Sequence, residues 1–234
     1  MTELITFKNV NKEYQTGEKT FKAVNNLNFT IKKGEFVIIL GPSGSGKSTL
    51  LNLLGGLDTV TTGKIIINTK EITQFNEKQL TKYRAEEIGF IFQFYNLIPN
   101  LTALENIELI NDISKHKIDG KKYLKQVNLL EHANKFPSEL SGGEQQRVSI
   151  ARAISKKPTM LLCDEPTGAL DSKTGKHIIK ILLELCQKNQ TTVIMVTHNI
   201  ELSKLANKII HLKNGQIEKI DINKKPKKID EINW

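Results

Sequence analysis

The residues with the clearest chemical purpose lie in the stretch GPSGSGKST, which follows the apolar run FVIIL and precedes LLNLL. It matches the G-x-x-x-x-G-K-[ST] pattern of a phosphate-binding loop, and its flanks predict the strand and the helix that such a loop requires. The glycines let the backbone approach an anion closely, Lys47 supplies a positive charge, and Ser48 offers a hard oxygen suited to Mg²⁺. The stretch predicts a nucleoside triphosphate site with magnesium. The alternative is a glycine-rich turn without a ligand. That interpretation would require the Lys-Ser pair and both flanking elements to be present by coincidence.

Two adjacent carboxylates, Asp164 and Glu165, end the apolar run TMLLC. At the carboxyl edge of a parallel sheet such groups face the ligand crevice. Asp164 could then reach Mg²⁺, directly or through water, and Glu165 could take a proton from an attacking water. The alternative is that the two acids are solvated loop residues, which are common at strand ends. The long apolar run before them and the phosphate loop elsewhere in the chain favour the catalytic interpretation.

Two other apolar runs also end in polar side chains: IGFIFQ ends in Gln93 and TTVIMVTH ends in His198. The amide oxygen of Gln93 could ligate the metal or hold a water, and His198 could donate to the γ-phosphate. A solvated glutamine and a structural histidine are the ordinary alternatives. The position of each residue at the end of an expected core strand favours a functional role.

A second anion site is indicated by LSGGEQQRVSIARAI, in which Ser141, Gly142 and Gly143 precede an expected helix. A hydroxyl and free amides at the positive end of a helix suit a phosphate. One chain with two half-sites suggests that the half-sites meet across a dimer. A helix cap that contains glycines is the alternative, and the local sequence does not exclude it.

The elements that would position these residues alternate between strand and helix, which indicates an α/β fold. Residues 3–35 show the alternation of antiparallel strands, with Tyr14 expected between two of them, where it could stack on an adenine base or simply pack. Residues 76–87 predict a helix and residues 94–139 an inserted helical lobe. Asn214-Gly215 predicts a hairpin turn. The apolar stretch FYNLIPNL within the lobe could contact a partner or pack onto the core.

Length and composition limit the class of protein. The 234 residues fit one large domain, and the sequence contains neither a membrane-spanning apolar run nor signal-peptide features, so a cytoplasmic protein is expected. The two cysteines are expected to pack as small apolar side chains. None of the histidines is spaced for a transition metal. The net charge of +9 includes KKPKK at residues 224–228, expected to be a solvated end near lipid headgroups rather than a nucleic-acid site.

The order of these motifs resembles the ATP-binding subunit of ABC transporters over nearly the whole chain: GPSGSGKST, IFQ, LSGGEQQR, MLLCDEP, ALD and VTH. LSGGEQQR is the motif that separates this family from other P-loop enzymes. IGFIFQFYNLIPNLTALENIEL and DEPTGALDSKTG are similar to the branch that serves macrolide export, lipoprotein release and antimicrobial-peptide resistance. The sequence departs from the branch pattern at Phe94-Tyr95 and in a short segment between Ile110 and Phe136, both where the family meets its membrane partner.

The resemblance implies a P-loop core at 1–93 and 159–234 that includes an antiparallel β subdomain, and a helical subdomain at 94–158. It implies that Tyr14 stacks on adenine, that Glu165 is the general base, and that His198 senses the γ-phosphate and Asp171 signals across the dimer. The implied metal ligands are Ser48, Gln93 and Asp164. The implied nucleotide contacts, besides Tyr14, Gln93 and Asp171, are Gly41, Pro42, Ser43, Gly44, Ser45, Gly46, Lys47, Ser48, Thr49, Ser141, Gly142, Gly143 and Glu144, with Lys47 also catalytic.

The function implied by the resemblance is an ATPase that dimerises around two ATP molecules and drives a separate membrane permease. The chain would be a peripheral protein on the cytoplasmic face of the cell membrane, without inserting into the lipid. The substrate would be a peptide, a lipid-linked molecule or a drug-like molecule. An ATPase that acts on nucleic acid or the ribosome is the alternative; the chain lacks the coiled coils, zinc-binding inserts and tandem ATPase domains of such proteins.

Overall fold

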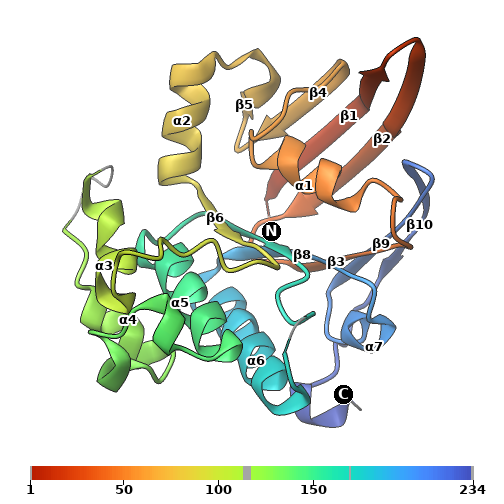
Figure 1. Ribbon diagram of the computed structural model, residues 1–234. Coiled ribbons are helices and arrows are strands. Elements are labelled where there is room, and N and C mark those ends of the chain that lie inside the picture. The colour runs from red at the N-terminus through yellow and green to blue at the C-terminus, as the bar shows by residue number, and fades with distance from the viewer. Residues whose placement is uncertain (1, 113–116, 169, 233–234) are drawn as a thin grey trace.

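The computed structural model describes residues 2–112, 117–168 and 170–232, so Ala169 of the ALD motif and His116 lie outside the described residues. Two sheets and the helices between and beneath them form stacked layers (Figure 1). This α/β architecture, with a mainly parallel sheet, an antiparallel sheet and a group of helices, confirms the predicted fold class.

The larger sheet has six strands in the order β10-β9-β3-β8-β7-β6. The five strands from β9 to β6 are parallel, and β10 pairs antiparallel at one edge through the predicted Asn214-Gly215 turn. The central strands β3, β7 and β8 are almost completely buried, as their continuous apolar sequences predict. The strands are β3 (Phe36–Leu40), β6 (Ile88–Ile91), β7 (Met160–Asp164), β8 (Thr192–Thr197), β9 (Lys208–Lys213) and β10 (Gln216–Ile222).

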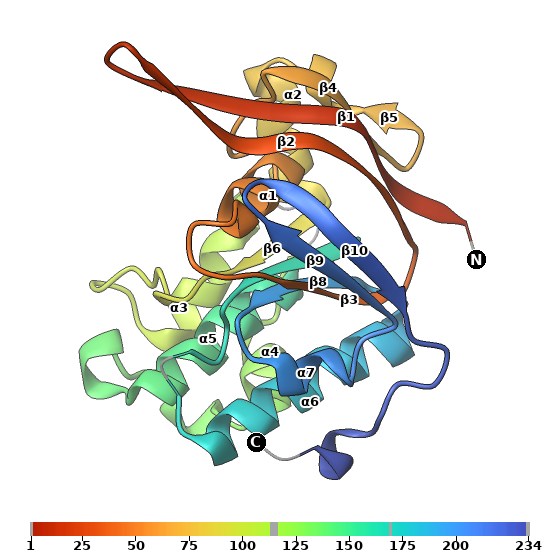
Figure 2. The same cartoon turned by 90° about the vertical axis from the view of Figure 1, so that its right-hand side faces the viewer.

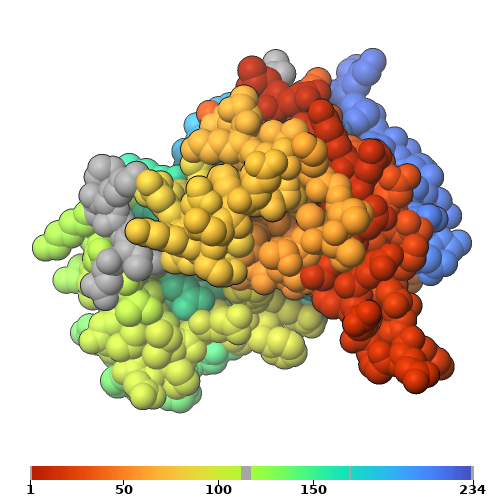
Figure 3. All heavy atoms as spheres, turned by 90° about the horizontal axis from the view of Figure 1, so that it is seen from above, coloured from red at the N-terminus to blue at the C-terminus, as the bar shows by residue number. Residues whose placement is uncertain are grey.

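The second sheet is antiparallel, in the order β2-β1-β4-β5, and covers the top of the molecule in Figure 3. Its buried and exposed side chains alternate along β1 and β2, as predicted for half-buried strands. Tyr14 lies inside β1 rather than between two strands, which corrects the sequence prediction. The strands are β1 (Glu3–Thr16), β2 (Lys19–Lys32), β4 (Thr62–Ile67) and β5 (Lys70–Glu71).

Helix α1 (Lys47–Leu54) lies between the two sheets, as Figure 2 shows. Four leucines of this helix are buried in one apolar core with side chains of β1, β3 and β4. The phosphate loop, residues 41–46, joins the end of β3 to the start of α1. Burial on both faces therefore fixes the helix whose N-terminus completes the loop.

The opposite face of the large sheet is covered by α5 (Gly142–Ser155) and α6 (Ser172–Asn189) (Figure 1). These helices share a second apolar core with the shorter helices α3 (Ala103–Glu108) and α4 (Gly120–Gln126). Both cysteines, Cys163 and Cys186, are buried in this core and free of disulfide bonds, as predicted.

The remaining helices are short. Helix α2 (Glu77–Glu86) has a capping box in which Asn76 and Gln79 exchange hydrogen bonds, and it follows the predicted range closely. Helix α7 (Ile200–Ser203) follows β8. The 3₁₀ turns are η1 (Ile72–Gln74), η2 (Leu109–Asp112), η3 (Leu130–His132), η4 (Pro137–Glu139) and η5 (Ile229–Glu231).

The basic segment at residues 224–228 is exposed, as predicted, but the chain that contains it is anchored. The Lys227 amide donates to the Lys204 carbonyl at 2.9 Å, and Ile229 is buried in the second core. Asp230 forms a 2.8 Å ion pair with Lys176 of α6. The lysine-rich segment is therefore solvent-exposed, and the residues that follow it are attached to the rest of the fold.

Candidate functional site

The phosphate loop is held by contacts that its glycines make possible. Gly44 and Gly46 have φ of +76° and +96°, which L side chains rarely adopt. A β-carbon on Gly46 would lie 2.3 Å from the Ala23 carbonyl oxygen on β2, whereas one on Gly44 would meet no atom within 4 Å. The backbone at Gly44 thus faces open space, where a ligand can approach, and Gly46 seats the loop against the antiparallel sheet.

Gly46→Ala should destabilise the fold more than Gly44→Ala. Both substitutions place a side chain at positive φ, which costs roughly 1–2 kcal/mol, but only the first also drives a methyl group into backbone. The free energy of unfolding, from urea titration of both variants, checks this. Equal losses would mean that the contact with Ala23 does not constrain the loop.

The loop opens into a cavity of about 710 Å³. Its lining combines loop residues with polar side chains that follow three of the parallel strands. These strands end at the same edge of the sheet, which is where ligands bind in open α/β sheets. The lining residues are Phe21, Ala23, Ser43, Gly44, Gly46, Lys47, Ser48, Thr49, Gln93, Asp164, Glu165 and His198.

Lys47 is 8 % exposed, and its ammonium donates to the carbonyl oxygens of Gly41 and Pro42, each at 2.8 Å. These bonds fold the side chain back over the loop, so its charge is concentrated where the backbone amides are free. Helix α1 begins at this lysine and adds the positive end of its dipole. The arrangement suits the phosphates of a nucleotide.

Asp164 ends β7, and its carboxylate hydrogen-bonds with Ser48 of α1. Burial raises the pKa of Asp164, and the neighbouring Glu165 carboxylate raises it further, although Ser48 and Lys47 act in the opposite direction. A divalent cation would relieve this unfavourable concentration of negative charge. The hydroxyl of Ser48, the carboxylate of Asp164 and the amide oxygen of Gln93 are oxygen donors of the kind that Mg²⁺ prefers, so the residues present fit the ion.

Gln93 follows β6 by two residues, because the strand ends at Ile91 rather than at the glutamine. Its side chain still lines the cavity. The sequence therefore predicted the position of the amide in space but not the end of the strand.

Among the described residues, no group of three or more His, Cys, Asp and Glu side chains could hold a metal.

Glu165 and His198 lie together at the mouth of the cavity. The Nδ1 atom of His198 is 3.1 Å from both carboxylate oxygens of Glu165. Glu165 has φ of +45°, which is unusual for a residue with a side chain, and its amide donates to the Val196 carbonyl at 3.1 Å. The backbone is thus held in a conformation that directs this carboxylate toward the cavity and the imidazole.

The other predicted anion site is not part of this cavity. Ser141 caps α5, donating its hydroxyl to Glu144 at 2.8 Å in a capping box, and Asp171 caps α6 by accepting from the amides of Lys173 and Thr174. Neither these caps nor Gly142 and Gly143 line the cavity of the same chain.

The two glycines of this second site have a packing role. A β-carbon on Gly142 would lie 2.6 Å from the Tyr95 hydroxyl, and one on Gly143 would lie 2.7 Å from Cγ2 of Thr174. Without β-carbons, these residues let the side chains of Tyr95 and Thr174 approach the start of α5 closely. This packing leaves the exposed Ser141 at the start of α5 on the surface.

Phe21 also lines the cavity, with 57 % of its surface exposed, although no motif in the sequence indicated it. Tyr14 is its directly paired neighbour on β1 and lies close to Thr49, a residue of the cavity wall. Opposed residues of antiparallel strands share a face, so pairing of residues 3–35 as a hairpin could have indicated Phe21.

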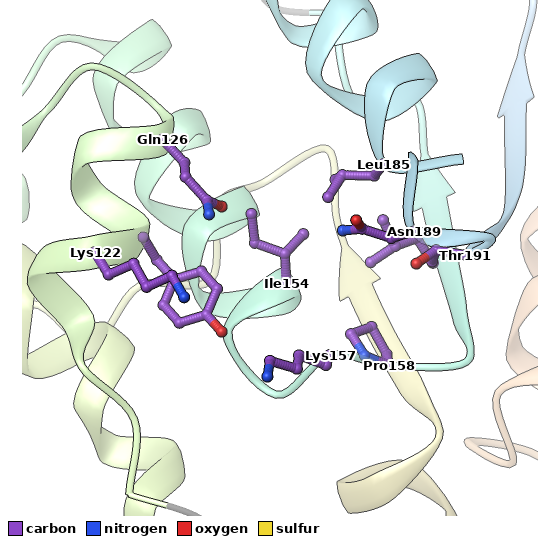
Figure 4. A pocket seen from close by; sticks show the side chains of 10 residues that line it. Lys122, Gln126, Ile154, Lys157, Pro158, Leu185, Asn189 and Thr191 are labelled. Carbon is purple, nitrogen blue, oxygen red and sulfur yellow. The ribbon is translucent and has the colours of Figure 1, made fainter. Parts of the chain in front are cut away.

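A second cavity, of about 440 Å³, lies between α4, the end of α5 and the end of α6 (Figure 4). Its lining includes Lys122, Lys157 and Asn189 around the apolar side chains of Ile154 and Leu185. None of the predicted site residues lines this second cavity.

The fold and the cavity together define a P-loop nucleoside triphosphatase. The mainly parallel sheet carries the phosphate loop, and a carboxylate pair and a histidine lie at the ends of its strands. The family model described as "ABC transporter" matches residues 24–168. The chain therefore belongs to the ABC transporter ATP-binding family, and it is an ATPase. The resemblance drawn from its motifs is confirmed.

Relatives support this assignment over the whole chain. An uncharacterised ABC transporter ATP-binding protein of Methanocaldococcus jannaschii, MJ0796, is 47 % identical over 92 % of this chain and 96 % of its own length. A putative ABC transporter ATP-binding protein of Mycoplasma pneumoniae is 40 % identical, and the chain spans only half of its length. The macrolide export ATP-binding/permease protein MacB of Mannheimia succiniciproducens is 44 % identical over 92 % of this chain but only 34 % of its own length.

Solved structures agree in fold. The dimeric post-hydrolysis structure of MJ0796, bound to ADP and Pi, superposes with a TM-score of 0.88 at 44 % identity over 94 % of this chain and 98 % of that chain. The structure of cbiO1 from Clostridium perfringens, described as part of the ABC transporter complex cbiONQ, has a TM-score of 0.83 at 26 % identity over 95 % of this chain and 89 % of that chain. The chain is thus an ABC transporter ATP-binding subunit of a kind that forms dimeric cassettes.

These comparisons give no support to the alternative of an ATPase that acts on nucleic acid or the ribosome. Within the described residues, every helix is too short or too polar to cross a membrane.

Proposed function

We propose that two copies of this chain associate head to tail and enclose two ATP molecules, each between the phosphate loop of one copy and the Ser141 region of the other. The observation that carries the proposal is that Ser141, Gly142 and Gly143, which lie at the N-terminus of α5 and suit a phosphate, do not line the phosphate-loop cavity of their own chain. The dimeric cassette bound to ADP and Pi supports this arrangement.

In this proposal Lys47 and the amides of residues 44–49 bind the phosphates, and Tyr14 stacks on the base. Ser48, Gln93 and Asp164 hold Mg²⁺, which neutralises the developing charge on the phosphates when bound. Glu165 accepts the proton of the attacking water, and His198, 3.1 Å from it, donates to the γ-phosphate. Each γ-phosphate would bridge two copies, so ATP favours the closed dimer and hydrolysis releases it.

Asp171 lies at the N-terminus of α6, six residues after Glu165 in the chain. The proposal gives it the role of reporting the state of one site to the facing copy. The core at 1–93 and 159–234 then carries the nucleotide, and the helical residues 94–158 carry the second half-site.

The dimer would lie on the cytoplasmic face of the membrane, and its closing motion would drive a separate membrane permease. Phe94 and Ile98 are exposed beside Gln93, which offers an apolar contact that moves with the nucleotide site. The name of the MacB relative, a macrolide export protein, supports an exporting or extracting system for a peptide, lipid-linked or drug-like substrate.

A site shared between two copies predicts that phosphate release per chain rises with chain concentration. The rate with MgATP should increase steeply until the dimer saturates, whereas a site complete in one copy would give a constant rate per chain. Phosphate release measured across a wide range of chain concentration, with EDTA as the metal-free control, checks this. A constant specific activity would contradict the shared site.

A further inference from the structure

The edge of the nucleotide cavity carries an aromatic side chain that no motif accounts for. Phe21 of β2 lines the cavity, and its directly paired neighbour on β1 is Tyr14. Because opposed residues of an antiparallel pair share a face of the sheet, both aromatic side chains project from the same face. Ala23 of the same strand touches the loop at Gly46, so β2 brings Phe21 close to any bound nucleotide.

The Tyr14 ring is fixed by two charged residues that the motifs also leave out. Its hydroxyl donates to Oδ2 of Asp58 at 2.6 Å. The other oxygen of this carboxylate, Oδ1, accepts from Nζ of Lys12 at 2.5 Å, and the same ammonium donates to the Thr59 carbonyl at 2.7 Å. Lys12 is only 9 % exposed, whereas the Asp58 side chain is 24 % exposed, so the pair is partly shielded from water and geometrically restricted.

Lys12 also lies over the Tyr14 ring, with its Nζ 4.9 Å from the ring centroid. The ammonium thus attracts the ring electrostatically, and Tyr14 remains 37 % exposed, so a ligand can reach it. A ring held at its hydroxyl and at one face loses little conformational freedom when a planar group stacks on it. Preorganisation of this kind improves affinity because the cost of ordering is already met.

We propose that Phe21 is a second base-contacting residue of the nucleotide site and that Asp58 and Lys12 are positioning residues that hold the Tyr14 ring for stacking. The inference rests on the proposed function, in which this cavity binds ATP. Tyr14 and Phe21 together form an aromatic shelf for the purine, and the phosphate loop binds the phosphates independently.

The test compares two ligands by isothermal titration calorimetry, MgATP and inorganic tripolyphosphate, which carries phosphates without a base. Phe21→Ala should weaken MgATP about 5- to 100-fold, the range expected for one stacking contact, and change tripolyphosphate affinity less than about two-fold. Asp58→Asn and Tyr14→Phe should each weaken MgATP about 3- to 10-fold, as expected for one hydrogen bond, with tripolyphosphate again unaffected. Ile222→Ala, which removes an exposed side chain of β10 outside the cavity, is the control.

Positioning is distinguished from a general structural effect by combining the two substitutions. Once Tyr14→Phe has removed the hydroxyl, Asp58→Asn should cause little further loss, because the two residues act through one hydrogen bond. Unchanged MgATP affinity in Phe21→Ala, additive losses in the double variant, or equal losses for both ligands would overturn the inference while leaving ATP binding intact. Failure of the unmodified chain to bind MgATP would instead overturn the proposed function, and this inference with it.

Discussion

Replacing Glu165 by Gln is expected to reduce ATP hydrolysis by at least about 100-fold, the typical contribution of a positioned general base, while ATP binding is retained. Glutamine keeps the size of the side chain but cannot accept the proton of the attacking water. The Asp164 carboxylate remains in place to organise the metal. ATP should therefore accumulate unhydrolysed in the closed state, and the variant should form a stable dimer.

Two measurements on this variant check the role of the glutamate: phosphate release with MgATP, and molecular mass by light scattering with and without ATP. Glu218→Gln, a substitution of an exposed glutamate on β10, is the matched control and should behave like the unmodified chain. A Glu165→Gln chain that hydrolyses ATP normally, or stays monomeric in ATP, would refute the assignment of the base.

Ser141→Arg should abolish closure of the dimer without harming the ability of each copy to bind ATP. The long charged side chain would occupy the space that the phosphates of the facing copy need, and the hydroxyl donor would be lost. Hydrolysis should fall roughly 100-fold, because a donor aimed at the developing charge is worth about that much. The affinity of a single copy for MgATP, from calorimetry, should stay within about two-fold of the unmodified chain, since Ser141 does not line its cavity.

Ser141→Arg also removes a helix cap, which costs about 1 kcal/mol on its own. Thr102→Arg is the matched control, because Thr102 caps α3 through the same kind of box with Glu105 and lies outside both half-sites. It should lose similar stability in urea titration and keep its ATPase activity. If both variants lose activity equally, or if Ser141→Arg hydrolyses ATP normally, the Ser141 region does not complete a site.

The sequence predicted the local elements well where apolar runs were long. The strands before Gly41, Glu165 and His198 are completely or nearly completely buried, and continuous apolar runs predict such strands directly. Each polar residue that follows one of these strands lines the same cavity. Because parallel strands end at one edge, order along the chain was enough to bring these groups together.

The parts that escaped prediction depend on contacts between distant segments. Phe21 reaches the cavity only through the register of β1 with β2, which contains several irregular steps. Asp58 belongs to a loop 44 residues away from Tyr14, and no local pattern indicates that they meet. Ile229 and Ile232, which follow the basic segment, are buried in a core whose helices precede them by tens of residues, and no local pattern indicates that contact.

The hydrogen bonds of Ser141 at the start of α5 affect how a phosphate could bind there. The Ser141 hydroxyl has a single proton, and it is given to the Glu144 carboxylate at 2.8 Å, which also accepts the Ser141 amide. These bonds lower the pKa of Glu144, so its negative charge persists at neutral pH. In the proposed dimer, a phosphate that binds at Ser141 would have to replace Glu144 as the acceptor of that proton and would lie next to its negative charge. Glu144 would then weaken the hold of the two copies on each other and make their association easier to reverse.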